Sequence, residues 1–109
     1  IWQGDANTMV LRSLAHCASP TTPLNLSGPE AVSIRALARS LGERLQKAPR
    51  FTGAESPVGW LINSGEAQRL FGYPAVPLAR MINWVADWVG HGRRSLGSET
   101  HYDSRDGAF

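Results

Sequence analysis

The sequence predicts an α/β fold, a small lobe with two or three short parallel strands and about four helices. Its 109 residues match the length of one domain with a single hydrophobic core. Apolar residues recur at helical spacing in several stretches, above all in 34–45 and 78–89. Between these stretches, short alternations of apolar and polar residues stand next to glycine and proline, as is typical of strands and turns.

The first part of the chain predicts an extended segment, a helix and a strand. Residues 1–3 are expected to be extended, and the side chain of Asp5 is expected to cap the helix that follows. Ser19 and Pro20 should end this helix. The stretch 23–29 is too short for a helix and alternates apolar with polar residues, which predicts a short strand and a turn. The apolar positions of the helix are Met9, Val10, Leu14 and Cys17.

The middle of the chain predicts a helix between two strands. Ser33 is expected to cap the helix, Pro49 should close it, and residues 50–52 before Gly53 predict a second strand. Because connections of the strand, helix, strand type cross over in the right-handed sense, the two strands should be parallel. The apolar stripe of the helix consists of Ile34, Leu37, Leu41 and Leu45.

A short helix is expected in the second half of the chain. Asn63 or Ser64 can cap it, and it should run to about Leu70 or Phe71. Gly72 then supplies a residue that is free to adopt the positive φ of a helix end.

A stronger helix is expected from Pro77 onward, with Gly90 as its C-terminal stop. Residues 1–94 then form one lobe, and residues 95–109 an extended C-terminal tail. The wide apolar stripe of this last helix consists of Leu78, Met81, Ile82, Val85, Trp88 and Val89.

Composition and charge exclude several classes of function. A net charge of +2, despite a pI near 9.2, gives no dense basic surface for nucleic acid. No apolar run is long enough to cross a bilayer, and the single cysteine, Cys17, cannot form an intrachain disulfide. We therefore expect a cytoplasmic protein without nucleic-acid or membrane partners. The chain starts at Ile1 with no signal-peptide pattern, and its start looks truncated.

The residue patterns that carry chemistry are incomplete. The glycines on either side of His91 follow a helix, whereas a dinucleotide-binding loop must follow a strand and precede a helix. His16 and Cys17 are neighbours, so on a helix their side chains point about 100° apart and do not pair as base and nucleophile. We therefore assign no catalytic, cofactor-binding or metal-binding residue. The remaining candidates for a metal, which lack paired short spacing, are His91, His101, Asp103 and Asp106.

Four tryptophans are many for a chain of this length, and exposed aromatic surface often marks a ligand wall or a partner interface. Trp84 and Trp88 lie beside the apolar stripe of the last helix, so we expect them to pack in the core. Trp2 and Trp60 lie at strand or loop ends and are candidates for contact with a ligand or a partner.

Several local motifs occur in a definite order along the chain. They are Gly4-Asp5-Ala6, Leu24-Asn25-Leu26-Ser27-Gly28, Ser33 with Leu37 and Ala38, Asn63-Ser64 with Ala67, Phe71-Gly72-Tyr73, and the helix 77–89. Their order and spacing resemble the C-terminal part of the extended short-chain dehydrogenases, the NAD-dependent epimerase/dehydratase family. The resemblance spans nearly the whole chain and rests on the set of motifs, since no single one is specific.

The resemblance implies that this chain is the smaller, substrate-binding lobe and lacks the Rossmann half with the nucleotide loop and the catalytic Tyr and Lys. The chain alone would then bind no cofactor and be inactive. The intact enzyme would use NAD(P) on a small molecule such as a sugar or sugar nucleotide. Family members specific for sugar nucleotides often carry an arginine, glycine and aspartate cluster, and here Arg50, Gly53 and Glu55 stand at a different spacing. The candidate substrate-binding residues are Trp2, Arg50, Glu55 and Trp60.

Two other classes of function remain open. The chain can be a free-standing interaction or small-ligand module that uses its tryptophan-rich surface to bind a partner or to form a homo-oligomer. Residues 34–42 also resemble the first helix and turn of a helix-turn-helix DNA-binding motif. Pro49 disfavours DNA binding, because it ends the segment before a recognition helix can form.

Overall fold

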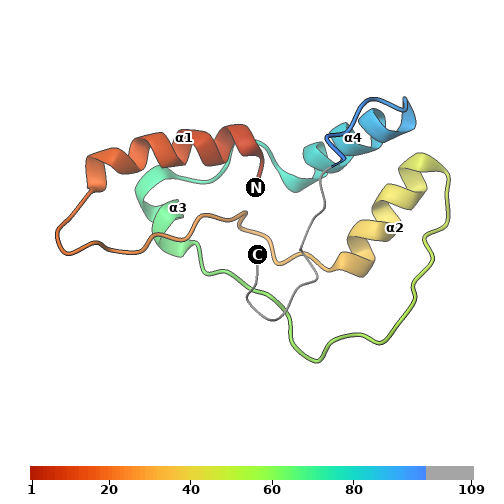
Figure 1. The fold of residues 1–109 in the computed structure, drawn as a ribbon, viewed down its shortest axis with the longest axis horizontal. Helices are drawn as coiled ribbons and strands as arrows, with labels where there is room; N and C mark the ends of the chain where they lie inside the picture. Colours follow the sequence, from red (N-terminus) through yellow and green to blue (C-terminus); the bar gives the residue numbers. More distant parts are fainter. Residues whose placement is uncertain (98–109) are drawn as a thin grey trace.

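The computed structural model describes residues 1–97, and in this range the chain is helical (Figure 1). It contains α1 (Gln3–Ser13), the 3-10 turn η1 (Leu14–His16), α2 (Ile34–Leu45), α3 (Gly65–Phe71) and α4 (Leu78–Gly90). Long connections without regular secondary structure join these helices, above all 17–33 and 46–64. Most of the expected C-terminal tail, 95–109, lies outside the described residues.

The predicted α/β fold is wrong, because residues 1–97 contain no β-strand. Of the three segments expected to be extended or strands, 1–3 runs into the start of α1, and 23–29 and 50–52 lack regular secondary structure. A strand forms only where a neighbouring strand takes up its backbone N–H and C=O groups. Within the described residues these segments do not pair with one another. Alternation of apolar and polar residues therefore identified non-helical backbone but not a sheet.

The predicted start of α2 and the predicted break after α3 are confirmed. The Ser33 hydroxyl accepts a hydrogen bond from the Ala36 backbone N–H at 3.3 Å and caps α2. Gly72 ends α3 with φ 83° and ψ −178°, a combination that only glycine adopts readily. α4 begins directly after Pro77 and ends with Gly90, as the sequence predicts.

α1 differs from the prediction in both its start and its end. The helix begins at Gln3, so Asp5 lies in its first turn and is not its cap. The carboxylate of Asp5 instead accepts a hydrogen bond from the Val76 backbone N–H at 2.9 Å, 71 residues away in the sequence. The α-helix ends at Ser13, earlier than the expected apolar position Cys17.

The helices form two pairs at opposite ends of the molecule (Figure 1). In the α1/α3 pair, Arg12 donates from Nη1 to the Phe71 carbonyl at 2.8 Å, and its guanidinium lies 5.1 Å from the centre of the Phe71 ring. In the α2/α4 pair, Arg44 donates from Nε to Asn83 Oδ1 at 2.6 Å. A small core lies at the α1/α3 end and consists of Met9, Ala67 and Phe71, with Leu24, Leu26 and Leu70 packed against it.

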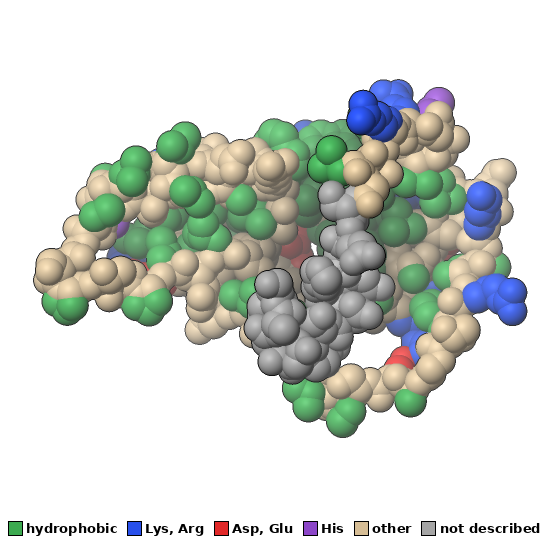
Figure 2. All heavy atoms as spheres, in the orientation of Figure 1, with side chains coloured by type: hydrophobic (Ala, Val, Ile, Leu, Met, Phe, Trp, Pro, Cys, Tyr) green, Lys and Arg blue, Asp and Glu red, His purple; other side chains and the backbone are tan. Residues whose placement is uncertain are grey.

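The chain exposes more surface than a compact protein of its size. Its accessible surface is 9095 Å², whereas a compact monomer of 11.8 kDa exposes about 5,900 Å². Its radius of gyration is 16.5 Å, against about 13 Å for a compact domain of 100 residues. Hydrophobic side chains are visible over α1 and along the outer edge of the connection 46–64 (Figure 2). Much apolar surface is therefore left uncovered by residues 1–97.

Candidate functional site

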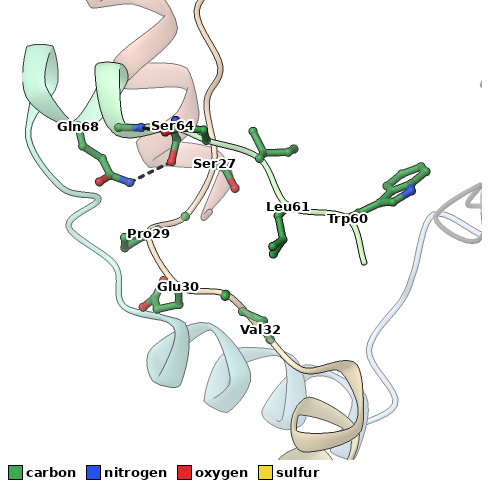
Figure 3. Close-up of a pocket in the computed structure, with 13 residues that line it drawn as sticks. Ser27, Pro29, Glu30, Val32, Trp60, Leu61, Ser64 and Gln68 are labelled. Atoms are coloured by element: carbon green, nitrogen blue, oxygen red, sulfur yellow. Dashed lines mark hydrogen bonds between the residues drawn. The ribbon is translucent and has the colours of Figure 1, made fainter. Parts of the chain in front are cut away.

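An open cavity of about 400 Å³ lies between two non-helical segments, residues 27–32 and 60–64, and the start of α3 (Figure 3). Figure 3 shows the Leu61 side chain pointing into the space between the two segments. The residues that line the cavity are Ser27, Gly28, Pro29, Glu30, Ala31, Val32, Trp60, Leu61, Ile62, Asn63, Ser64, Gly65 and Gln68.

The start of α3 anchors one wall of this cavity. Asn63 Oδ1 accepts a hydrogen bond from the Gly65 backbone N–H at 3.0 Å, and Ser64 is buried with only 5% of its surface exposed. Gln68 donates from Nε2 to the Ser64 hydroxyl at 2.9 Å, one turn along the helix (Figure 3). Asn25 donates from Nδ2 to the Asn63 carbonyl at 3.4 Å and so links the two segments that form the cavity.

The lining combines an apolar wall with a few polar groups. Trp60, Leu61 and Ile62 are each more than half exposed, and such side chains can contact the apolar faces of a ligand. Glu30 is the only acidic or basic residue in the lining. A carboxylate accepts hydrogen bonds from hydroxyl groups, but it has no histidine, lysine or cysteine beside it in this lining. The cavity therefore has an apolar wall and a carboxylate with which to bind a ligand.

Of the four predicted site residues, only Trp60 lines the cavity. Glu55 lies in the same connection but accepts hydrogen bonds from Arg35 of α2, one of them from Nε at 2.9 Å. The hydrogen bonds and the positive charge of Arg35 lower the pKa of Glu55 below its ordinary value. Arg50 is exposed and does not line the cavity. Arg50 and Glu55 therefore do not belong to this cavity.

Trp2, the fourth candidate, lies against α4. Its ring contacts that of Trp84 edge to face, with the ring centres 5.8 Å apart. The expectation that Trp84 and Trp88 pack in the core is wrong, because each has almost half of its surface exposed. The Trp88 indole N–H donates to the Arg94 carbonyl at 3.1 Å. These three tryptophans thus belong to a surface around α4 and not to the cavity.

Sequence reasoning missed Glu30, Leu61 and Gln68 as cavity residues. Two signals in the sequence pointed toward them. The turn residues Gly28 and Pro29 stand directly before Glu30, and Gln68 follows Ser64 at the spacing of one helical turn. What the sequence lacks is a sign that residues about 35 positions apart would face each other.

No metal centre and no membrane-spanning helix is found in residues 1–97. In this part of the chain, no three His, Cys, Asp or Glu side chains come together in a way that could hold a metal ion. None of its helices is long and apolar enough to cross a membrane.

Comparisons with protein-family models, with curated proteins and with solved structures found no match to this chain.

Proposed function

We propose that this chain is the substrate-binding portion of an NAD(P)-dependent epimerase, dehydratase or reductase and is not catalytic alone. One observation carries the proposal. Two of the motifs on which the family resemblance rests, 24–28 and 63–64, meet at the same cavity although 34 residues separate them in the sequence. A cavity built by such distant motifs is what a substrate-binding role requires.

The openness of the cavity also supports a role as part of a larger pocket. Its apolar wall is exposed, and the chain as a whole has about 3,000 Å² more surface than a compact monomer of its mass. A second unit that carries NAD(P) and the catalytic groups would cover this wall and close the pocket. The proposal assigns the cofactor to that unit and none to this chain.

The lining favours a small polar substrate with apolar faces, such as a sugar or the sugar part of a sugar nucleotide. The Trp60 ring can pack against the C–H face of a sugar, and the Glu30 carboxylate can accept hydrogen bonds from its hydroxyl groups. Ser27 adds a hydroxyl on the same segment as Glu30 (Figure 3).

The first test is the coding sequence that adjoins this chain. A glycine-rich strand, turn and helix followed by a Tyr and Lys pair would supply the missing half, and its product should reduce or oxidise NAD(P). In that product, Trp60→Ala should raise KM about ten-fold, the loss expected for one apolar contact with a ligand. Trp88→Ala is the matched control, because Trp88 is a similarly exposed tryptophan that does not line the cavity, and it should leave KM unchanged.

A second test uses the chain as it stands. Isothermal titration with NAD⁺ and NADP⁺ should give no heat of binding, because the proposal places the cofactor on another unit. Binding of either nucleotide by this chain alone would count against the proposal, as would an adjoining sequence without the nucleotide-binding half.

A second candidate function, self-association, is favoured by the exposed face of α4. Trp84, Val85, Trp88 and Val89 form a shallow apolar groove, and each is about half exposed. A stable dimer buries about 800 Å² on each partner, and this groove would form the centre of such an interface. Sedimentation should then show a dimer that Trp88→Ala weakens and Trp60→Ala does not. A monomer at all concentrations would remove this candidate.

A further inference from the structure

One arginine holds the outer connection of the molecule at two points. Arg35, in the first turn of α2, donates hydrogen bonds to Glu55 from Nε and from Nη2. The same guanidinium lies over the ring of Phe51, 4.4 Å from its centre. Phe51 and Glu55 lie in the connection 46–64, the longest segment between two helices in residues 1–97. One wall of the cavity belongs to this connection.

We infer that Arg35 is a positioning residue, a clasp that holds residues 51–62 against α2 and thereby keeps the apolar wall at Trp60 and Leu61 beside the cavity. We call residues 51–62 the strap. Its far end is tied by the hydrogen bond from Asn25 to the Asn63 carbonyl. The strap is therefore fixed on one side by Arg35 and on the other by Asn25, with the cavity wall between the two anchors.

The loop length shows why the clasp matters. Without it, Trp60 would lie in a connection of 19 residues, from Gln46 to Ser64, and the hydrogen bond at Asn63 would lie at the far end of this connection. With it, the wall lies in the eight residues between Glu55 and Ser64. A shorter loop between fixed points has fewer conformations, so the cost of holding the wall in place is smaller. Ser56 contributes locally, because its hydroxyl accepts a hydrogen bond from the Val58 N–H at 3.2 Å.

The clasp is also exposed, so its strength depends on salt. The Arg35 and Glu55 side chains have 42% and 76% of their surface exposed. Interactions between exposed charges are screened over about 10 Å at 0.1 M salt and about 3 Å at 1 M. Raising the salt concentration should therefore release the strap, whereas the hydrogen bonds and packing of the α1/α3 core should be little affected.

Limited proteolysis with chymotrypsin tests the clasp in the chain as it stands. Cleavage after Phe51, Trp60 and Leu61 reports opening of the strap, and cleavage after the buried Phe71 reports opening of the core. Arg35→Gln should speed cleavage in the strap about two- to five-fold, the effect of losing an exposed cation–π contact. The cleavage rate of Arg35→Lys should lie between those of the unaltered chain and of Arg35→Gln, because lysine keeps the charge but loses the planar group with several donors.

The matched control is Arg69→Gln. Arg69 also pairs with a glutamate, Glu66, at 2.5 Å on an exposed helix surface, but it touches no part of the strap. This variant should leave cleavage in the strap unchanged. Raising NaCl from 0.1 M to 1 M should speed cleavage in the strap of the unaltered chain. The same change should speed cleavage less in Arg35→Gln, which has already lost the clasp.

Two outcomes would overturn the clasp. One is an Arg35→Gln variant whose strap is cleaved at the rate of the unaltered chain. The other is an equal acceleration after Phe71, because that would mean a general loss of stability. The effect of the clasp on substrate binding rests on the proposed function, but the proteolysis does not. In an active full-length enzyme, Arg35→Gln should raise KM two- to five-fold and leave kcat unchanged.

Discussion

The two helix pairs bury their apolar residues to very different extents. At the α1/α3 end, Met9, Ala67 and Phe71 are all buried. At the α2/α4 end, Ala86 is the only buried residue of the two helices, although these helices have the clearest apolar stripes in the sequence. A strong apolar stripe therefore predicts that a helix face packs against another surface, but it does not predict that the described part of this chain provides that surface.

The largest effect expected from this comparison is the loss of the small core. Phe71→Ala should destabilise the chain by about 3 kcal/mol, because it leaves a cavity beside Met9 and Ala67. Urea denaturation followed by circular dichroism measures the change. Phe51→Ala, at a half-exposed phenylalanine, should cost about 1 kcal/mol or less. Equal effects of the two substitutions would mean that the α1/α3 end is not the stable end.

The break after α3 should be the next most sensitive position. Gly72 has φ 83° and ψ −178°, and a side chain there should cost about 1–3 kcal/mol. Gly72→Ala should accordingly lower the urea midpoint. Gly59→Ala is the control, since Gly59 lies in open space with no heavy atom within 4 Å of an added Cβ. A Gly72→Ala variant as stable as Gly59→Ala would contradict this account of the break.

The two arginines that link the helix pairs should differ less in their contribution to stability. Arg12 makes both a hydrogen bond and a ring contact with the buried Phe71, so Arg12→Ala should cost about 1 kcal/mol. Arg44 bonds to the exposed Asn83, so Arg44→Ala should cost no more than about 0.5 kcal/mol. The same denaturation experiment measures both costs. A larger cost for Arg44→Ala than for Arg12→Ala would contradict the view that the α1/α3 end is the more stable one.

The smallest expected effect is the pH dependence of two arginine–glutamate pairs. Arg35 lowers the pKa of Glu55, and Arg69 lowers that of Glu66. Because each pKa is depressed, each pair is fully formed above the ordinary value of 4.5 and is lost as pH falls through the lower folded value. In an NMR titration, Arg35→Gln should return Glu55 to its ordinary pKa and leave Glu66 depressed. Arg69→Gln should do the converse, and a Glu55 that is insensitive to Arg35→Gln would contradict the pairing.

Local rules in the sequence predicted the helices well. Ser33 can cap a helix through its own side chain, and Gly72 marks a helix end through its own conformational freedom. None of these features depends on distant residues. The strands depend on a partner strand, which the described part of the chain does not supply, and for this reason the α/β prediction was wrong.

The candidate site shows the same limit. Trp60 was predicted from the residue and its place alone, because exposed aromatic residues in loops often contact ligands, and it lines the cavity. The pairing of Glu55 was not predicted because its partner, Arg35, lies 20 residues earlier on another element. Asp5 was misassigned for the same reason, since its partner is the backbone of Val76. Contacts over such separations have no local pattern in the sequence.

The four half-exposed tryptophans can serve as intrinsic fluorescence probes. Tryptophan emission moves to shorter wavelength when water around the ring is replaced by protein or ligand. Trp60 lies at the cavity, while Trp2, Trp84 and Trp88 lie around α4, so variants that keep one of these emitters would report on one surface each. A blue shift confined to Trp60 would place a bound molecule at the cavity without any label, and one confined to Trp88 would place it on the last helix.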